Sequence, residues 1–389
     1  MKDWRRLGLR SSDWEKVKLG ELCQINKKTY SVSEKWGVVN YLDTGNLTED
    51  QIQQFQYIET EKDKLPSRAR RKVEYDDILY STVRPNQHHY GIVKEIVPNM
   101  LVSTGFAVIS VDKSKADSDF IYYYLTQNEI VETLHVIGEQ STSAYPSIKP
   151  SDITNLKLSL PSLEEQKEIS RVLRLLDKKI ENNKKINHHL EQMAMAIWKH
   201  LFGNREPNAN LGDIIELFDS KRVPLSSKQR EEMEKIYPYY GAATLMDYVE
   251  SYLFDDIYLL LGEDGTVIES SGQPILQYVW GKFWVNNHAH VLQGKEGFST
   301  ESLYILLKQV NVSSIVTGAV QLKINQTNLK SLPIVRPTSG ELDYFNNLIA
   351  PLFSKIRRNS DETSILTHLR DSLLPKLLSG EIPVNQAAK

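Results

Sequence analysis

The segment AYPSIKPSDITNLKLSLP (residues 144–161) recurs in altered form 176 residues later as VQLKINQTNLKSLPIVRP (residues 320–337). From these segments to the end of the chain, the two copies align without a gap. Self-similarity at a fixed offset indicates a duplicated architecture. A chain of 389 residues is also long enough to bury the cores of two folding units. The sequence therefore predicts two related halves.

Shorter motifs upstream repeat in the same order. Each half has a Leu-Gly-acidic turn, then an aromatic-acidic-acidic motif that begins a strand, then a helix with a Tyr-Leu signature. The first copy has VKLGELCQI (17–25), EYDDILYS (74–81) and DFIYYYLTQNEIV (119–131), and the second has ANLGDIIELF (209–218), LFDDIYLLL (253–261) and ESLYILLKQV (301–310). We therefore expect one mixed helix-and-strand fold, used twice.

Each half ends in one long amphipathic helix. Its apolar residues alternate 4 and 3 apart, except where Asn183 and Asn187 interrupt the series, and the second copy keeps the same heptad phase. The positions are Ile169, Leu173, Leu176, Ile180, Leu190, Ala194, Ile197 and Leu201, followed in the second copy by Phe345, Ile349, Leu352, Ile356, Asn359, Leu366, Leu373 and Leu377. Two heptad helices of one phase predict a coiled coil. The alternative is that each helix packs only on its own domain.

The connectivity predicts how the two helices run. The first leads from one domain into the next and the second starts where that domain ends, so the short path makes them antiparallel. From Leu163 to Phe202 a helix extends about 60 Å at ~1.5 Å per residue, longer than a small domain is wide. Asn183 and its repeat mate Asn359 are expected to meet at the centre, where a buried polar pair fixes the register at some cost in stability. Alternatively, both face solvent.

The composition is typical of a soluble globular protein, with 40% hydrophobic and 25% charged residues and no acidic or Pro/Gly/Ser-rich tract. Cys23 is the only cysteine, which excludes an internal disulfide and fits a reducing cytoplasm. We see no signal peptide and no apolar run of membrane-spanning length, so we expect a cytoplasmic protein without membrane contact. The net charge of −3 argues against nonspecific coating of nucleic acid but allows local clusters of positive charge.

Several segments resemble the specificity subunits of type I restriction-modification systems, the HsdS family. LSLPSLEEQKEISRVLRLLDKKIENN (158–183) is similar to the first conserved helix of that family, and LRDSLLPKLLSGEI (369–382) to the end of the second. DDILYS (76–81), LGEDGTVIESSGQP (261–274) and WVNNHAHVL (284–292) are similar to target recognition domains. The resemblance covers residues 14–382, with one departure: PTSGELDYF (337–345) replaces the PSLEEQ (161–166) of the first copy.

The resemblance implies an α+β fold: two mixed α/β target recognition domains separated by two long helices, which form an antiparallel coiled coil with a pseudo-two-fold repeat. We place the first target recognition domain at 1–160, the first conserved helix at 161–203, the second domain at 204–337, the second helix at 338–382 and a tail at 383–389. Such subunits read an asymmetric double-stranded DNA target in two parts. They assemble with methyltransferase subunits, generally two, and with restriction/translocase subunits. S-adenosylmethionine, ATP and Mg²⁺ are then expected on those partners, with no cofactor in this chain.

A catalytic role finds no support in the motifs. The chain has no Pro-Pro pair, hence no Asn/Asp-Pro-Pro-aromatic motif for amino methylation, and no phosphate-binding G-x-x-x-x-G-K-[ST] loop. We therefore expect a non-catalytic subunit. Two alternatives stay open: a catalytic methyltransferase or fused restriction enzyme, and a coiled-coil scaffold without DNA function.

Candidate DNA contacts in the first domain lie in three segments. Clustered cations can hold phosphates, and Arg, Asn and Gln can bond base edges. The candidates are Lys62, Lys64, Arg68, Arg70, Arg71 and Lys72; then Arg84, Asn86, Gln87, His88, His89 and Tyr90; and Tyr145. A solvated charged face and an ordinary polar hairpin loop are the corresponding alternatives.

The second domain offers a comparable set, consisting of Lys221, Arg222, Lys228, Tyr240, Lys282, Asn287, His288 and His290. His288 and His290 lie on one face of a predicted strand, and paired histidines can bind a metal. Because the sequence shows no clear third ligand, we expect no metal site and assign these residues to hydrogen bonds with bases or phosphates.

Overall fold

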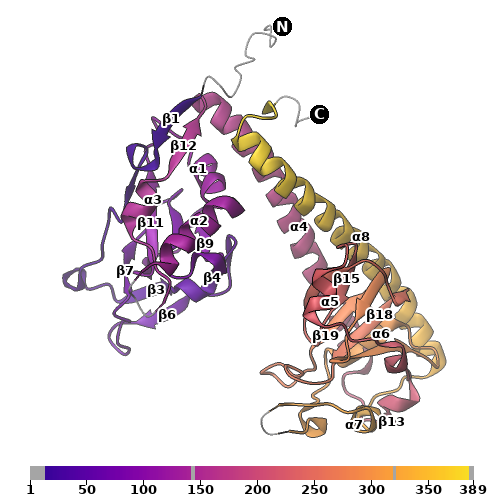
Figure 1. Ribbon diagram of the computed structural model, residues 1–389. Helices are drawn as coiled ribbons and strands as arrows, with labels where there is room; N and C mark the ends of the chain where they lie inside the picture. Colours follow the sequence, from indigo (N-terminus) through magenta and orange to yellow (C-terminus); the bar gives the residue numbers. More distant parts are fainter. Residues whose placement is uncertain (1–13, 142–144, 319–320, 385–389) are drawn as a thin grey trace, which may run out of the picture. The chain divides into compact units, whose positions relative to one another are not determined.

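A computed structural model describes residues 14–141, 145–318 and 321–384 (Figure 1). The chain divides into two compact units, both of mixed helix and sheet. Unit 1 comprises Met1–Ile180 and Ser364–Lys389, and unit 2 comprises Glu181–Thr363. No helix in the described part of the chain combines the length and apolar character needed to cross a membrane.

Unit 1 contains two four-stranded sheets. The first has the order β2 (Cys23–Ile25), β11 (Phe106–Val111), β8 (Ile78–Ser81), β9 (Tyr90–Ile92). The second has the order β6 (Gln56–Glu59), β3 (Val38–Leu42), β10 (Met100–Ser103), β7 (Ala69–Lys72), with β3 and β10 parallel. Two further pairs are β1 (Glu15–Lys18) with β12 (Lys157–Leu160), and β4 (Leu47–Thr48) with β5 (Gln51–Ile52). The short helices are α1 (Ser118–Leu125), α2 (Asn128–Glu139) and α3 (Pro150–Thr154).

Unit 2 repeats this topology. Its sheets have the orders β14 (Ile215–Leu217), β21 (Ala289–Gly294), β18 (Tyr258–Gly262), β19 (Leu276–Val279), and β16 (Leu245–Val249), β15 (Tyr237–Tyr240), β20 (Lys282–Val285), β17 (Phe254–Asp255). The parallel pair recurs as β15 with β20. β13 (Ala209–Asn210) pairs with β22 (Pro333–Ile334), and the short helices are α5 (Ser227–Glu231), α6 (Thr300–Leu307) and α7 (Gln326–Lys330).

Alternating side chains place the first sheet of each unit between two cores. In β8, Ile78 and Tyr80 face the core under the helices, while Leu79 packs between the two sheets. In β18, Leu261 faces the helical core and Leu260 the inter-sheet core. Successive strand residues point to opposite faces, so a continuous apolar run serves both layers.

The two long helices have the same length and equivalent ends. α4 (Leu163–Phe202) and α8 (Ser339–Leu378) each contain 40 residues and begin 176 positions apart. A hydroxyl residue precedes each helix: Ser162 accepts the Glu165 N–H at 3.3 Å, whereas the N–H and the hydroxyl of Thr338 donate to the Glu341 carboxylate at 3.0 and 2.8 Å. The caps are repeat mates, so the differing sequences at the two helix starts leave the start position unchanged.

Within each unit, a half of α4 packs against a half of α8 in antiparallel fashion. In unit 1, Asp177 binds Arg370 at 3.0 Å, and Leu173 shares a core with Leu377. In unit 2, the C-terminal Trp198 of α4 packs on Phe345 near the start of α8, at 5.0 Å between ring centroids. The predicted antiparallel coiled coil and the pseudo-two-fold repeat are confirmed. The domain limits given in the sequence analysis stay a prediction, because the two compact units each combine a globular part with parts of both long helices.

One arginine on a long helix joins that helix to the globular part of each unit. Arg174 in α4 binds Asp50 at 3.1 Å and Asp119 at 2.7 Å in unit 1. Arg357 in α8 binds Glu301 at 2.8 Å in unit 2. These charge-assisted contacts fix each domain on its own helix segment.

Candidate nucleic-acid interface

Each unit has a pair of loops that contact each other. The pair lies at the end of β8 in unit 1, and the equivalent pair lies at the end of β18 in unit 2. In unit 1, the Ile148 N–H donates to the Thr82 carbonyl and the Arg84 N–H to the Pro146 carbonyl, both at 2.9 Å. In unit 2, Ile324 donates to Glu263 at 2.9 Å and Gly265 to Leu322 at 3.0 Å. Pro146 and Leu322 are repeat mates, as are Ile148 and Ile324. The backbone therefore builds the same two-loop surface twice, while the side chains on it differ.

The structure brings Arg84 and Tyr145 together on the unit 1 surface. The guanidinium carbon lies 4.9 Å from the centre of the Tyr145 ring, and that ring is 59% exposed. Cations stack favourably on aromatic faces, and arginine does so with its whole plane. Two segments predicted separately thus form one contact surface.

The remaining residues of this loop divide by exposure. Asn86 and Gln87 are exposed. His88 contacts Glu49 at 2.8 Å, and His89 contacts the Leu47 carbonyl at 2.7 Å. Tyr90 is only 6% exposed, because it stacks on Tyr80 inside the unit 1 core. Its burial removes Tyr90 from the candidate surface.

The basic cluster of unit 1 lies on and before the edge strand β7. Arg68 is exposed and Arg70 half-buried, and neither side chain forms an ion pair with any described residue. Lys64 is likewise exposed. Three members have internal partners: Lys62 pairs with Glu59 at 2.5 Å, Lys72 with Glu34, and Arg71 donates to Thr29 at 3.4 Å. Arg68 and Arg70 are therefore the cations best placed to meet a phosphate.

In unit 2, Lys221, Lys228, Lys282 and Asn287 are exposed. Tyr240 is half-buried and packs edge-on against Phe283. Arg222 is engaged internally, because its guanidinium binds Glu263 and the Ala289 carbonyl, each at 2.7 Å. We therefore remove Arg222 from the candidate DNA contacts.

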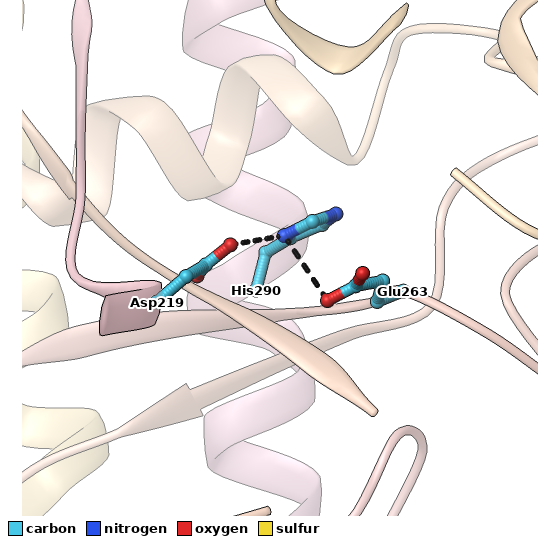
Figure 2. A group of neighbouring side chains, drawn as sticks. All are labelled: Asp219, Glu263 and His290. Carbon is cyan, nitrogen blue, oxygen red and sulfur yellow. Dashed lines mark hydrogen bonds and ion pairs between the residues drawn. The ribbon is translucent and has the colours of Figure 1, made fainter. Parts of the chain in front are cut away.

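Three buried or half-buried groups from distant parts of the sequence form one cluster in unit 2. His290 lies between Asp219 and Glu263, with its Nδ1 at 2.6 Å from Asp219 Oδ2 and 3.7 Å from Glu263 Oε2 (Figure 2). Its Nε2 faces the Ile324 carbonyl at 2.7 Å. The two ring nitrogens thus face the Asp219 carboxylate and the Ile324 carbonyl. Since His290 is fully buried, it does not contact DNA.

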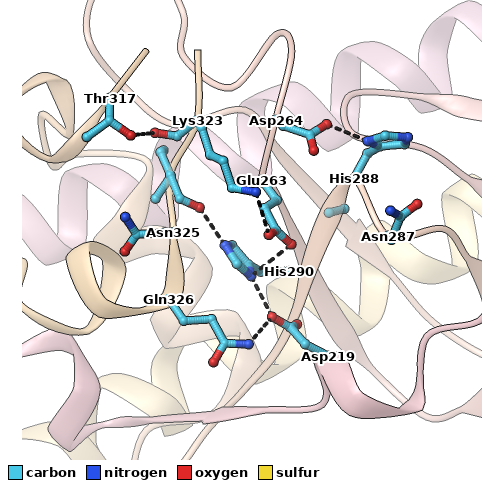
Figure 3. A network of polar contacts seen from close by, with 12 residues as sticks. Asp219, Glu263, Asp264, Asn287, His288, His290, Thr317, Lys323, Asn325 and Gln326 are labelled. Atoms are coloured by element: carbon cyan, nitrogen blue, oxygen red, sulfur yellow. Dashed lines mark hydrogen bonds and ion pairs between the residues drawn. The ribbon is translucent and has the colours of Figure 1, made fainter. Parts of the chain in front are cut away.

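The surrounding residues satisfy the two carboxylates (Figure 3). Asp219 accepts from the Gln326 amide at 2.6 Å and from the Val291 N–H at 2.9 Å. Burial raises the pKa of Asp219, but its hydrogen bonds and the charges of His290 and Arg222 outweigh burial and hold that pKa below its usual value.

Asp219, Glu263 and His290 have the residue types of a metal site and lie close enough to share an ion. Arg222 and Lys323, however, already pair with Glu263, and His290 Nδ1 already contacts Asp219. A divalent cation there must displace Arg222 and Lys323 from Glu263. The cluster therefore fits an internal ion network better than a metal centre.

This network fixes the loops that carry the exposed polar groups of unit 2. It ties Asp219 at the end of β14, Glu263 after β18 and the 323–326 segment to β21. Beside it, His288 pairs with Asp264 at the surface, and Lys323 is 47% exposed (Figure 3). Asp219 and Lys323 were missed from the sequence, because they lie far apart along the chain and match no motif.

Asn183 and Asn359 are both 1% exposed at the contact of α4 with α8. The Asn183 amide donates to the Asn359 carbonyl at 3.4 Å and to Glu362 at 2.8 Å. The Asn359 amide donates to Asn187 Oδ1 at 2.8 Å. The two residues thus meet inside the helix pair, and their effect on register stays a prediction.

The fold and the paired loops define a protein with two related recognition units on one chain. The type I restriction modification DNA specificity domain, as a family model, matches residues 11–192 and 208–364. The chain belongs to this family.

Two curated relatives match almost the whole chain. The type I restriction enzyme MjaIX specificity subunit of Methanocaldococcus jannaschii is 27% identical, over 98% of this chain and 96% of the relative. The type I restriction enzyme HindI specificity subunit of Haemophilus influenzae is 23% identical, over 95% of this chain and 100% of the relative.

A solved structure has the same fold. The type I restriction-modification system S subunit from M. genitalium superimposes with a TM-score of 0.56 at 18% identity, covering 94% of this chain and 96% of the other.

Proposed function

We propose that this chain is the DNA specificity subunit of a type I restriction-modification enzyme and that it reads a bipartite, asymmetric target. The observation that carries the proposal is the duplicated two-loop surface: one backbone geometry presents Arg84 and Tyr145 in unit 1 and Asp264 and Lys323 in unit 2. Two equivalent readers with different side chains suit two different half-sites. The family membership and the relatives support the same function.

Recognition then combines two kinds of contact. Lysines and arginines such as Arg70 and Lys228 hold phosphates and supply affinity without sequence preference. Side chains on the loop surfaces bond base edges in the major groove and supply the sequence preference. The network around His290 keeps the unit 2 loops in place before DNA arrives, which reduces the ordering that binding has to bring about.

In this proposal the chain itself is non-catalytic and assembles with methyltransferase subunits, two in number, and with restriction/translocase subunits. Those partners hold S-adenosylmethionine, ATP and Mg²⁺ and carry out adenine-N6 methylation and DNA cleavage. The long helices α4 and α8, which are continuous through both units, are the elements that we assign to this assembly. The complex acts in the cytoplasm, on the DNA of the cell.

A selection from randomised DNA tests the proposal. With the methyltransferase partner present, the chain should enrich a sequence with two short specific parts and an unspecific spacer between them. If no sequence is enriched, the chain is a scaffold and the proposal fails. The purified chain alone, given S-adenosylmethionine and that DNA, should transfer no methyl group; transfer by the chain alone would establish the enzyme alternative.

A further inference from the structure

Arg84 stands at a backbone position that favours glycine. Its φ is 48°, in the left-handed region, and the equivalent residue of unit 2 is Gly265, with a φ of 89°. The equivalence is set by the backbone: both residues donate to repeat mates, Pro146 and Leu322. A side chain at a left-handed position costs free energy that glycine avoids, and such strain is found mainly at functional sites.

The side chain of Arg84 accounts for its presence there. It stacks on Tyr145, whose repeat mate in unit 2 is Gln321. The stacked pair therefore belongs to unit 1 alone, whereas the backbone that carries it is common to both units. A residue retained for folding only would be needed equally in both.

The guanidinium edges of Arg84 point to a ligand. Within the described residues no carboxylate pairs with Arg84, whereas Arg174 and Arg222 are both occupied by carboxylates. Stacking holds the guanidinium plane by its face and leaves the N–H groups at its edge unused. Paired N–H donors on a fixed plane match the O6 and N7 acceptors of guanine, the commonest specific contact in the major groove.

We propose that Arg84 reads a guanine in the first half of the DNA target and that Tyr145 is a positioning residue that fixes the guanidinium plane. This inference rests on the proposed function. It makes a G·C base pair an essential part of the half-site read by unit 1. The strained backbone of Arg84 is then the structural cost of holding this side chain at the protein surface.

The decisive variant is R84G, because glycine removes the side chain and relieves the backbone at the same position. In the complex with its methyltransferase partner, R84G should fold at least as stably as the wild type by thermal denaturation. Its preference for G·C at one base pair of the first half-site should fall by about 10- to 100-fold in binding competition. Preference in the other half-site should stay unchanged.

Variants at Tyr145 separate positioning from simple packing. Y145L removes the ring and should weaken discrimination at the same base pair as R84G, by a smaller factor. Y145F keeps the ring and should restore most of that discrimination. Affinity for unrelated DNA should not change in either variant, because no phosphate contact is assigned to Tyr145.

Two results would overturn the inference. A uniform loss of affinity over all sequences in R84G, with a weaker salt dependence, would make Arg84 a phosphate contact. Unchanged discrimination in R84G would leave it without a DNA role. Both differ from failure of the proposed function, in which the wild-type complex itself selects no sequence.

Discussion

Asp219 shows at the scale of a single residue how the unit 2 surface depends on buried charge. Its carboxylate touches His290, Gln326 and the Val291 N–H, and only 5% of its side chain is exposed. Removing one partner of a buried pair leaves the other charge uncompensated, which costs more than the pair itself contributes. His290 therefore depends on Asp219 for its place beneath the loops.

We predict that D219N destabilises the protein by about 3–5 kcal/mol, because it removes the buried carboxylate that contacts His290, Gln326 and the Val291 N–H. Chemical denaturation monitored by far-UV circular dichroism measures this change. D255N, at an exposed carboxylate of β17 in the same unit, is the matched control and should stay within about 0.5 kcal/mol of the wild type. Equal changes in unfolding free energy for the two variants would show that the network around His290 does not stabilise the protein.

We also predict that the difference in stability between the wild type and D219N depends on pH. The pKa of Asp219 is held below its usual value in the fold, so its stabilisation is complete above the unfolded-state pKa. That stabilisation is lost as pH falls through the lowered folded-state pKa. The difference in unfolding free energy between wild type and D219N should therefore shrink as the pH falls below about 4. Denaturation curves at several pH values measure it, and a difference that grows on acidification would contradict the assigned sign.

Phosphate contacts have a different signature from base contacts. We predict that R68Q and R70Q each weaken binding to all DNA sequences alike and reduce the slope of log affinity against log salt by about 1. Fluorescence anisotropy at several salt concentrations measures both. K62Q is the control, because Lys62 already pairs with Glu59 and should change the slope less. A change confined to one target sequence would instead make Arg68 or Arg70 a base reader.

The sequence indicated which residue types could contact DNA, but it did not show which of those side chains are exposed. Arg84 and Tyr145 were each proposed from the sequence, yet their stacking depends on loops about 60 residues apart. Tyr90, Arg222 and His290 were also proposed, and each is occupied inside the protein. Exposure and partner choice follow from non-local packing, which residue types in one segment do not determine.

At the scale of the element, the long helices were the most predictable part of the chain. The heptad spacing and the offset of the repeat located both, because amphipathic periodicity is a local property of the sequence. The sheets were less predictable: the parallel pairs β3 with β10 and β15 with β20 join strands that are far apart in sequence. Sequence periodicity predicts where a strand lies, but it does not predict which strand pairs with it.

The asparagines inside the helix pair give a prediction at this scale. N359A removes the donor to Asn187 and leaves that half-buried acceptor without its partner, so we expect a loss of about 1–3 kcal/mol in unfolding free energy. Urea denaturation measures it. N347A changes an exposed asparagine of the same helix and should be neutral or slightly stabilising. A stable N359A variant would show that the polar contact is dispensable.

At the scale of the whole molecule, duplication explains why one chain can serve two half-sites. Each unit has its own cores, its own sheets and its own two-loop surface, while α4 and α8 run through both. The side chains that read DNA can therefore change in one unit without altering the other.

Helix length should set the spacer between the half-sites. One extra heptad in both α4 and α8 adds about 10 Å of helix, which corresponds to roughly three base pairs of DNA. We predict that the preferred spacer lengthens accordingly in a selection from randomised DNA. A heptad inserted into the loop before α5 is the control and should leave the spacer unchanged. An unchanged spacer in the helix variant would contradict the idea.

In the proposed function, one polypeptide carries two independent readers of DNA. Mapping N6-methyladenine across the genome of cells that express the chain with its methyltransferase partner tests it most directly, with wild type compared to R84G. We predict a two-part motif in which R84G relaxes one half and leaves the other half and the spacer intact. A single contiguous motif, or relaxation of both halves together, would contradict it.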